Sequence, residues 1–501
     1  MFKRFTLLAL VALMAVPALP AVAQTQEDAL RFTQRAPATG ARLMGLAGAG
    51  GAGVGDWAAV FSNPAGLGWL QTSEAVGSLN VLSTLNDATL GGATLDARAN
   101  RTGLSNLGYA YKAPTVRGSF VFGVGFNQTG TFERDLFFTG QNGQNSITDF
   151  FMPLPGEFEL NEDENGEIVV DFFRPISFLA FETFAIDFDQ DLFDAGDAVP
   201  FLPAVTDGTV LQEGDVFETG NQNELSFGGS IEAAPKVMLG LGANLTFGTY
   251  DFDRVFFESD ENNENDGFNG TTDFNSLELN ENIESDIVGI NLRGGLSAEV
   301  AEGVRVGLTV ETPTYYTVDE GFSTRLFTEF DNGDTFSQEE FGGVEYEIVS
   351  PWRLGGGIAF ANRGLLISAD AELVDWSQLE LRPSGDLSEN FFDANNREIR
   401  RGFDQVVNTR LGAEYDFGAV ALRGGYAYQP DPASTDELDR SRQFVSAGLG
   451  FNAGDQLQIN VGWMRETFDD RYQPYTEVID APVVTEEVTR DRLSVGVRVR
   501  L

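Results

Sequence analysis

The sequence predicts an all-β protein: a transmembrane antiparallel β-barrel of about 14 strands, with a small N-terminal hatch (plug) inside the lumen. Three observations lead to this fold class. Apolar and polar residues alternate with a period of two from about residue 73 to the end, short and long connections alternate, and the chain begins with a secretory signal. Together they indicate an exported protein that crosses a membrane with strands.

Residues 1–23 form the expected signal peptide. Lys3 and Arg4 give a short basic region, the apolar run 5–19 follows, and Ala21-Val22-Ala23 is a small-x-small cleavage site. An uncleaved membrane anchor is the alternative, but the apolar run is short and the cleavage site is good. Beyond this site no uninterrupted apolar stretch reaches the roughly 20 residues that a spanning helix needs.

The composition excludes most enzyme chemistry. The 501 residues include no Cys and no His, which rules out disulfides, thiolate metal sites, Ser-His-Asp triads and His-ligated zinc. A formal net charge of −44 repels nucleic acid phosphates. We therefore expect neither an enzyme, nor a cofactor, nor a nucleic-acid partner, although carboxylate pairs and lysine-activated nucleophiles stay open.

The strand pattern is clearest at the C-terminus, where the apolar residues of 493–501 alternate with small or charged ones. Similar alternation runs over 352–360, 407–415 and 457–463. A soluble sandwich also alternates, so this pattern alone does not identify a membrane barrel. The expected strands are 73–85, 102–113, 117–130, 223–235, 236–251, 284–300, 303–318, 338–361, 364–378, 405–417, 419–430, 441–453, 456–468 and 489–501.

The connections favour the membrane barrel. Short turns alternate strictly with long loops, as in outer-membrane barrels with tight periplasmic turns. The even number of strands requires 338–361 to be one strand across Ser350-Pro351, because two strands would make the number odd. The expected long loops are 86–101, 131–222, 252–283, 319–337, 379–404, 431–440 and 469–488, of which 131–222 and 252–283 are strongly acidic.

Aromatic residues near the ends of the expected strands suit a belt at the membrane interface. They are Tyr109, Tyr111, Trp352, Trp376, Tyr415, Tyr426, Tyr428 and Trp463. In a soluble barrel the same residues would lie in the core.

The segment ahead of the first strand contains GLAGAGGAGVGDWAAVFSNPAGLGWL, residues 45–70. Its formal G-x-G-x-x-G, Gly48 to Gly53, lacks the preceding strand that a dinucleotide site requires. We interpret residues 24–72 as a compact hatch, because Gly and Ala allow backbone to pack on backbone. Asp56 is the expected N-cap of a short helix from Trp57 to Ser62, and proline at position 64 restricts Asn63 to an extended conformation.

The most distinctive pattern consists of Gly40-Ala41-Arg42, Gly45, Gly48-Ala49, Asp56 and Ala59–Leu67. This pattern resembles the FadL/TodX-type family of outer-membrane long-chain fatty-acid and hydrocarbon transporters. The resemblance implies a 14-stranded barrel in the bacterial outer membrane, gated by a hatch that includes Arg42, Asp56, Asn63, Pro64 and Ala65. There are two departures: the chain ends in Leu501 instead of the terminal Phe of many outer-membrane barrels, and the acidic 131–222 insertion is unusually long.

The resemblance also implies a function. It is passive uptake of hydrophobic compounds, long-chain fatty acids foremost, with lateral exit through a break in the third strand. The expected partners are the apolar ligand, outer-membrane lipid and, during biogenesis, the barrel-assembly machinery. A general porin, and a barrel that serves secretion or surface-protein attachment, are the alternatives.

Candidate ligand contacts come from two places. Arg353, Arg410 and Arg423 fall on the expected lumen face, where one of them could pair with a ligand carboxylate. The same face carries acidic partners, so mutual ion pairing is the alternative; they are Asp370, Glu372, Glu414 and Asp416. In the acidic insertion, Phe178, Phe181 and Phe184 belong either to a greasy groove or to a self-packed cap.

Acidic runs at 187–197 and 259–267 resemble calcium loops, but neither has the EF-hand glycine in register. We therefore expect no metal site. Asp187, Asp189 and Asp191 are the weak alternative.

Overall fold

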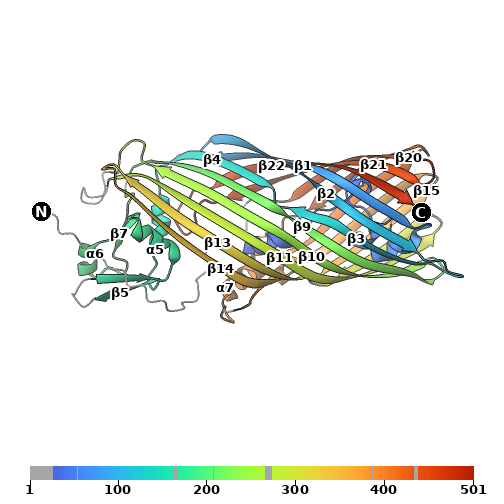
Figure 1. Cartoon of the computed structure of the whole chain (residues 1–501), viewed down its shortest axis with the longest axis horizontal. Helices are drawn as coiled ribbons and strands as arrows, with labels where there is room; N and C mark the ends of the chain where they lie inside the picture. The colour runs from blue at the N-terminus through green and yellow to red at the C-terminus, as the bar shows by residue number, and fades with distance from the viewer. Residues whose placement is uncertain are drawn as a thin grey trace.

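One antiparallel sheet closes on itself to form a barrel (Figure 1). The computed structural model describes residues 26–53, 55–162, 168–206, 208–265, 273–385, 387–433 and 438–501, and the expected signal peptide lies outside them. The first strand, β1 (Glu74–Leu90), pairs with both β2 (Ala93–Lys112) and the last strand, β22 (Val484–Arg500), which closes the sheet. We call the end of the barrel that carries Leu501 the short-turn end and the opposite end the cap end.

The barrel crosses 14 times, as predicted. Within the described residues the sheet has 18 strand segments, but four pairs of consecutive segments each continue along the same neighbours and form one crossing. These pairs are β3 (Phe120–Thr131) with β4 (Arg134–Asn142), β12 (Val304–Glu311) with β13 (Tyr315–Phe330), β14 (Thr335–Val349) with β15 (Arg353–Asn362), and β16 (Leu365–Asp375) with β17 (Glu380–Pro383). The other crossings are β1, β2, β9 (Val210–Ala234), β10 (Val237–Ser259), β11 (Phe274–Ala301), β18 (Gln405–Asp416), β19 (Val420–Gln429), β20 (Arg442–Ala453), β21 (Leu457–Tyr472) and β22.

The single strand expected over 338–361 is confirmed as one crossing that is interrupted at residues 350–352. Strand β14 pairs with β13, and β15 pairs with β12, which continues into β13. Proline cannot donate a hydrogen bond to the ladder, so the interruption falls at Pro351. Ser350 bridges the gap, because its N–H donates to the Thr314 carbonyl at 3.0 Å and its hydroxyl accepts from the Thr314 N–H at 2.8 Å.

The strands run further toward the cap end than the sequence pattern suggests. The expected loop 86–101 is instead a hairpin of β1 and β2, which turns at Gly91 and Gly92 with φ of 56° and 90°. Two positive φ values at a two-residue turn are typical of type I′ hairpins, which need glycine. Similar extensions shorten the loops expected at 252–283 and 319–337. At these strand ends the apolar residues face inward, as Phe256, Leu277 and Leu326 do, so the outward apolar pattern of the belt does not continue.

Exposed apolar side chains form a belt around the outside of the barrel. Leu241 on β10, Ile290 on β11 and Leu308 on β12 are 65%, 58% and 62% exposed, a degree that is natural only against lipid. Exposed aromatic residues lie in this outer surface too: Tyr111, Phe122, Phe247, Tyr315, Trp352, Tyr415, Phe417 and Tyr426. Trp376, expected in the belt, is instead buried in the lumen, because the chain leaves β16 at Asp375 and turns through η3 (Trp376–Gln378).

Nearer the cap end, the outer surface is acidic. Asp286 on β11 lies directly opposite Asp319 on β13, which lies opposite Glu345 on β14. Carboxylates in this cross-strand register repel one another unless water and counterions surround them. Part of the excess negative charge therefore lies on extended strands, and not in loops alone.

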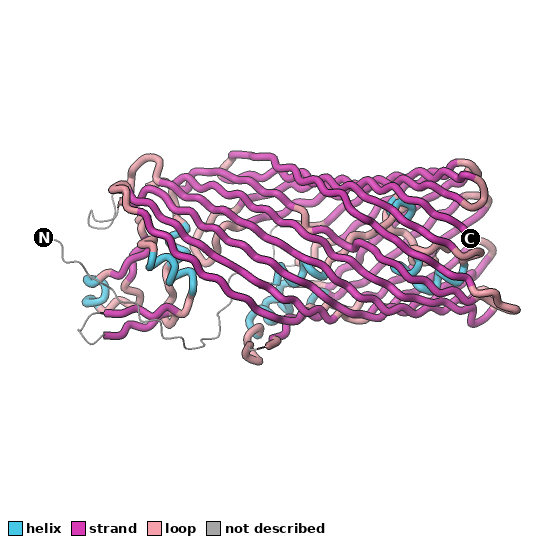
Figure 2. Tube along the Cα trace, viewed as in Figure 1, coloured by secondary structure: helices cyan, strands magenta, loops and turns pink. Residues whose placement is uncertain are grey.

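Two groups of helices accompany the barrel (Figure 2). The N-terminal segment, residues 26–72, packs against the inner wall and contains α1 (Gln26–Thr33), α2 (Ala41–Met44), α3 (Ala59–Ser62) and η1 (Pro64–Trp69). Between β4 and β9 the chain forms a small unit at the cap end, which we call the cap (the described part of residues 143–209). The cap contains α4 (Ile147–Phe151), β5 (Phe158–Glu162), β6 (Ile168–Phe172), α5 (Pro175–Glu182), β7 (Ile186–Phe188), α6 (Gln190–Ala195) and β8 (Phe201–Pro203).

A further helix, α7 (Asp393–Gly402), lies between β17 and β18, with Ile399 buried in a cluster that also contains Trp376 and Tyr346. None of the helices in the described part of the chain has the length and apolar character needed to cross a membrane.

Candidate functional site

The N-terminal segment begins with α1, which is held against the inner wall by aromatic contacts. Phe32 is buried, with its ring centroid 5.7 Å from that of Phe132 and 5.4 Å from that of Tyr250. Arg31 donates to the Tyr250 hydroxyl at 3.0 Å and lies 3.7 Å from the Glu218 carboxylate. These contacts join α1 to β9 and β10 and to the residues between β3 and β4.

The glycine-rich part of the segment binds an anion, but that anion belongs to the barrel wall. The N–H groups of Gly50 and Gly51 donate to Oδ2 of Asp370 on β16 at 2.6 and 2.7 Å. Gly307 of the wall lies so close that a Cβ there would sit 2.1 Å from the Gly51 carbonyl oxygen. The formal G-x-G-x-x-G therefore serves backbone-to-wall packing, which tolerates no side chain at such positions.

Asn63 joins three parts of the structure, and its backbone is extended as predicted (φ −145°, ψ 103°). Its Nδ2 donates to the Gly51 carbonyl at 2.7 Å and to the Leu296 carbonyl of β11 at 3.1 Å. Its Oδ1 accepts from the Ala65 N–H at 3.1 Å, so Asn63 caps η1 with Pro64 as the first helical residue. The Asn-Pro-Ala sequence thus fixes both the fold of the segment and its contact with the wall.

A chain of ion pairs joins the segment to strands β18 and β19. Arg42 pairs with Asp56 inside the segment and with Glu414 of β18 at 2.9 Å, and Glu414 also pairs with Arg423 of β19. Asp56 accepts from the Ala58 N–H at 3.0 Å, and helix α3 begins at Ala59, two residues later than predicted.

A second, buried network lies beside α1. Glu311 of β12 accepts from Nε of Arg293 at 2.7 Å and pairs with Arg35 at 2.8 Å. Glu224 of β9 completes the network, 3.3 Å from Arg293 and 3.9 Å from Arg35. Two arginines and two glutamates thus balance in the interior, and only Arg35 belongs to the N-terminal segment.

A cavity of about 420 Å³ lies inside the barrel beside α1, which is within the size range of small-molecule sites. Its lining is amphipathic. Aromatic rings come from the N-terminal segment, the wall and the cap, among them Phe32, Tyr250, Trp376, Phe444 and Phe468, with Phe150 from the cap. Arginines and carboxylates lie between these rings. Such a lining suits a ligand with a long apolar part and a polar end.

The structure brings one of the predicted ligand residues to this cavity. Arg353 lines it, donates to the Thr33 carbonyl at 2.8 Å and lies 3.4 Å from Glu372. Arg410 pairs with the same Glu372 at 3.3 Å, a contact within the wall, and Arg423 pairs with Glu414, which also pairs with Arg42 of the N-terminal segment. Asp416, expected in the lumen, is exposed at the short-turn end, where it accepts from the Gly418 N–H.

The three predicted ligand phenylalanines of the acidic insertion, Phe178, Phe181 and Phe184, lie in the cap and do not line the cavity. Phe181 packs against Phe172 and Phe201 at 5.4 and 6.2 Å, a self-packed aromatic cluster. Phe178 is half-buried, and Phe184 is exposed against Phe336 of β14 at 4.6 Å.

The aspartates of the weak metal alternative serve local turns. Asp189 caps α6 by accepting from the Leu192 N–H at 2.7 Å, and Asp187 accepts from the Phe188 N–H at 2.8 Å. Asp191 lies in the first turn of α6. Among the described residues, no group of three or more acidic side chains has the geometry to hold a metal ion.

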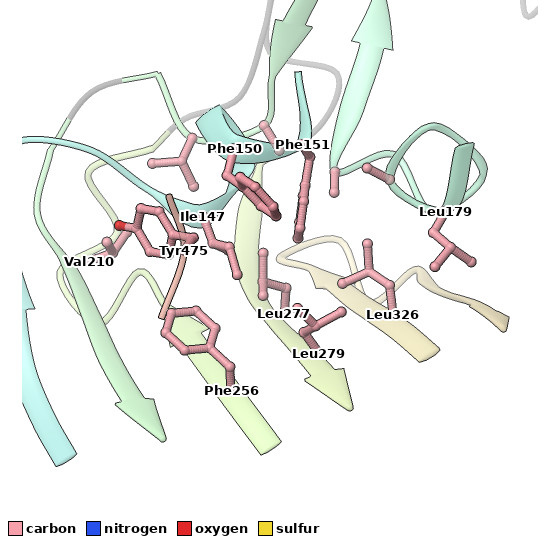
Figure 3. Packing of buried hydrophobic residues seen from close by; sticks show 14 of the residues in the cluster. Ile147, Phe150, Phe151, Leu179, Val210, Phe256, Leu277, Leu279, Leu326 and Tyr475 are labelled. Atoms are coloured by element: carbon pink, nitrogen blue, oxygen red, sulfur yellow. The ribbon is translucent and has the colours of Figure 1, made fainter. Parts of the chain in front are cut away.

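The cap closes the barrel with a hydrophobic core (Figure 3). Ile147, Phe150 and Phe151 of α4 point toward Phe256 of β10 and Leu277 of β11. Further residues of the same core include Leu279, Leu326, Val210, Leu179 and Tyr475. Because β1, β10, β11, β13, β22 and the 473–483 loop contribute to this core, the cap is fixed to the whole cap end and not only to β4 and β9, the two strands that flank it.

A buried carboxylate lies at the edge of this core. Glu258, at the cap end of β10, accepts from the Ser146 hydroxyl, from the Ile147 N–H at 3.2 Å and from Nε2 of Gln212 at 2.6 Å. Burial raises the pKa of Glu258 from 4.5 to about 7, although these hydrogen bonds act in the opposite direction. Asp149 of α4 and Tyr475 are the neighbouring ionisable groups.

The packing of the cap should therefore weaken as pH rises. A raised folded-state pKa means that the contribution of Glu258 is complete below about pH 4.5, declines up to about pH 7 and is constant above. The loss is at most about 3 kcal/mol. We expect faster proteolysis of the cap at pH 8 than at pH 5. Glu258→Gln should lose this pH dependence, because glutamine does not titrate. Glu261→Gln, an exposed neighbour, should behave as wild type; an unchanged pH profile in Glu258→Gln would contradict the assignment.

The third crossing strand is interrupted where it meets the N-terminal segment. Register with β9 shifts between Gln128 and Gly130, and Phe132-Glu133 belongs to neither β3 nor β4. Among the described residues, 93–104 of β2 pair with β1 but with neither β3 nor β4. The wall thus has a seam, bridged by the ion pair of Arg101 with Glu133. The Ala36 N–H donates to the Thr129 carbonyl at 3.1 Å, so the N-terminal segment touches the seam.

The closed 14-strand sheet, its apolar outer belt and its internal N-terminal segment define a β-barrel of the outer-membrane type. No protein-family model matches the chain, and comparison with curated proteins gives no match.

Solved structures agree with this fold. The chain is similar to the P. putida toluene transporter TodX (TM-score 0.53, 15% identity, 93% of this chain and 99% of that one). It is also similar to a Pseudomonas aeruginosa FadL homologue (TM-score 0.57, 12% identity, 93% and 99%). At these identities the likeness establishes the FadL/TodX-type fold, which confirms the fold that the resemblance implied.

Proposed function

We propose that this barrel carries hydrophobic compounds, long-chain fatty acids foremost, passively across a bacterial outer membrane. The observation that carries this proposal is the aromatic-lined cavity inside a barrel whose lumen is filled by the N-terminal segment. A general porin needs an open polar lumen instead. The fold shared with a toluene transporter supports the same class of ligand. We place the barrel in the membrane with the cap outside the cell and the short-turn end facing the periplasm.

The direct test is uptake into liposomes that contain the refolded protein. We expect uptake of palmitate and exclusion of glucose, because the segment blocks polar solutes. Glucose uptake at a comparable rate would identify a porin. Uptake of neither solute would favour the attachment or secretion alternative.

Gating by the N-terminal segment predicts a specific effect at Asn63. Asn63→Ala removes three hydrogen bonds: one within the segment, one to the wall and one that caps η1. Their loss should destabilise the docked segment by ~1–3 kcal/mol. We expect palmitate uptake to fall roughly tenfold while the barrel still folds, since about 1.4 kcal/mol corresponds to tenfold. Folding is checked by heat-dependent electrophoretic mobility. Asn332→Ala, in an exposed turn, is the control; equal uptake in both variants would argue against gating at Asn63.

We further propose that the ligand leaves sideways through the seam between β2 and β3/β4. The missing strand pairing there and the contact with the N-terminal segment support this route. In the Arg101→Cys/Glu133→Cys variant, a bismaleimide linker should join the two sides and stop most palmitate uptake. The protein has no native Cys, so only the introduced thiols react.

The control is a linker across a fully paired part of the wall. Arg465 and Asp491 form a 2.7 Å ion pair between β21 and β22, so Arg465→Cys/Asp491→Cys is the matched pair. Its cross-link should leave uptake unchanged. Full uptake with a closed seam would refute the lateral route.

A further inference from the structure

Three arginines lie together on the inner face of the last three strands. They are Arg442 of β20 and Arg490 and Arg492 of β22, and all three line the cavity. On β21 between them, Glu466 lies directly opposite Arg490 in the strand register, and Met464 lies opposite Arg492. The alternation of the strands therefore places all of these side chains on one patch of the lumen wall.

The single carboxylate of Glu466 does not balance the three positive charges of this patch. Glu466 lies 3.3 Å from Arg442 and 3.9 Å from Arg490. Among the described residues, no carboxylate forms an ion pair with Arg492, and its buried Nε has no hydrogen-bond partner. The Nε of Arg490 is also without a partner among these residues. Arg492 is only 8% exposed, so an unpaired guanidinium is held in the interior at a substantial cost.

The surroundings of the patch are apolar and close to the N-terminal segment. The Phe468 ring lies between two of the cations, with guanidinium carbons of Arg442 and Arg490 at 4.7 and 5.1 Å from its centroid. Phe444 and Met464 belong to the same hydrophobic cluster as Leu43 and Met44 of the segment. An anion at the patch would thus lie at the boundary between the cavity and the hatch, beside apolar surface.

We infer that Arg442, Arg490 and Arg492 form the subsite for the negatively charged head of an amphiphilic ligand, whose apolar tail lies against the aromatic residues of the cavity. This inference rests on the proposed function and narrows it, because a neutral hydrocarbon leaves the charge of Arg492 unpaired. A carboxylate or another single anionic head supplies the missing partner through charge-assisted hydrogen bonds. None of these arginines was a candidate from the sequence.

The test compares two probes that differ only in the head. Calorimetric titration of the full barrel in amphipol with decanoate and with decan-1-ol should show decanoate binding more than about tenfold tighter. Arg492→Leu should weaken decanoate by roughly 10- to 100-fold, the loss of one charge-assisted pair, and leave decan-1-ol unchanged. Arg492→Lys keeps the positive charge and should retain part of the preference for decanoate over decan-1-ol.

Arg465→Leu is the matched control, since it removes an arginine from the outer face of β21. Electrophoretic mobility checks that each variant folds. Equal affinity for the two probes, or an Arg492→Leu variant that keeps the preference for decanoate, would overturn the subsite while palmitate uptake still supports the transporter. Absence of both binding and uptake would remove the proposed function and the subsite together.

Discussion

Replacement of Gly307 by valine is expected to displace the N-terminal segment and to turn the blocked lumen into an ion-conducting channel. A Cβ at this position would lie 2.1 Å from the Gly51 carbonyl oxygen and 2.8 Å from the Ala52 Cα, far inside contact distance. The strand register leaves Gly307 no room to withdraw, because it pairs with β11 on one side and β15 on the other. The segment must therefore move, at a cost typical of overpacking, ~1–3 kcal/mol.

The consequence extends beyond one contact. Movement of Gly51 also breaks the hydrogen bonds of Gly50 and Gly51 with Asp370 and of Gly51 with Asn63. Several attachments of the segment to the wall are thus lost together. We expect a several-fold rise in single-channel conductance in planar bilayers, with normal heat-dependent mobility of the barrel.

A glycine on the outer face provides the control. Gly356 of β15 lies next to Gly357, the register partner of Gly307, but its Cβ would make only ordinary contacts, 3.6 Å from the Leu308 side chain and 3.8 Å from the Gly307 carbonyl oxygen. Gly356→Val should therefore keep wild-type conductance. If Gly307→Val also stays closed and folded, the segment does not seal the lumen by backbone contact at this position.

The sequence pattern predicted those features that follow from local rules. Lipid on one side and a polar lumen on the other impose a two-residue period, which located the strands of the belt. Pro64 restricts Asn63 for steric reasons that operate within two residues, and the structure confirms the extended backbone. Strand segments nearer the cap end escaped detection because their apolar residues, among them Phe256, Leu277 and Leu326, face the cap inside the barrel instead of lipid, so the outward apolar pattern of the belt stops there. Only Gly91-Gly92 marked the hairpin of β1 and β2.

The candidate site was predictable only in part, because its residues meet through the closure of the barrel. Arg353 could be placed on the lumen face, but nothing local indicates that it lies beside Trp376 in a cavity. Arg490 and Arg492 lie within the expected strand 489–501, so tracing the alternation from Leu493 back to residue 489 would have placed both on the lumen face. The excess of positive charge at this patch becomes visible only when Glu466, the inner residue opposite Arg490, is placed beside the arginines. Glu466 lies on another strand, so no single stretch of sequence shows the excess.

Loss of the Glu311 carboxylate is expected to cause the largest loss of stability. Glu311 pairs with Arg35 of the N-terminal segment and with Arg293 of the wall, and all three are mostly buried. Glu311→Gln would leave two buried guanidinium groups to share Glu224. Removal of one partner from a buried ionic network costs ~3–5 kcal/mol, because the remaining charge stays desolvated. We expect a decrease of this size in the free energy of unfolding in guanidinium chloride, with lower hydrogen-exchange protection of α1.

A double substitution separates charge imbalance from lost packing. Arg35→Gln combined with Glu311→Gln leaves the balanced pair Arg293–Glu224, so the combined loss should be smaller than the sum of the single losses. Glu299→Gln removes the partner of Lys236, which is 61% exposed, and should cost no more than about 1 kcal/mol. If Glu311→Gln costs no more than Glu299→Gln, the network does not hold the N-terminal segment. If the double variant instead loses the full sum, Arg35 and Glu311 contribute independently, and the coupling between segment and wall must come from other contacts, among them those of Asp370, Asn63 and Arg42.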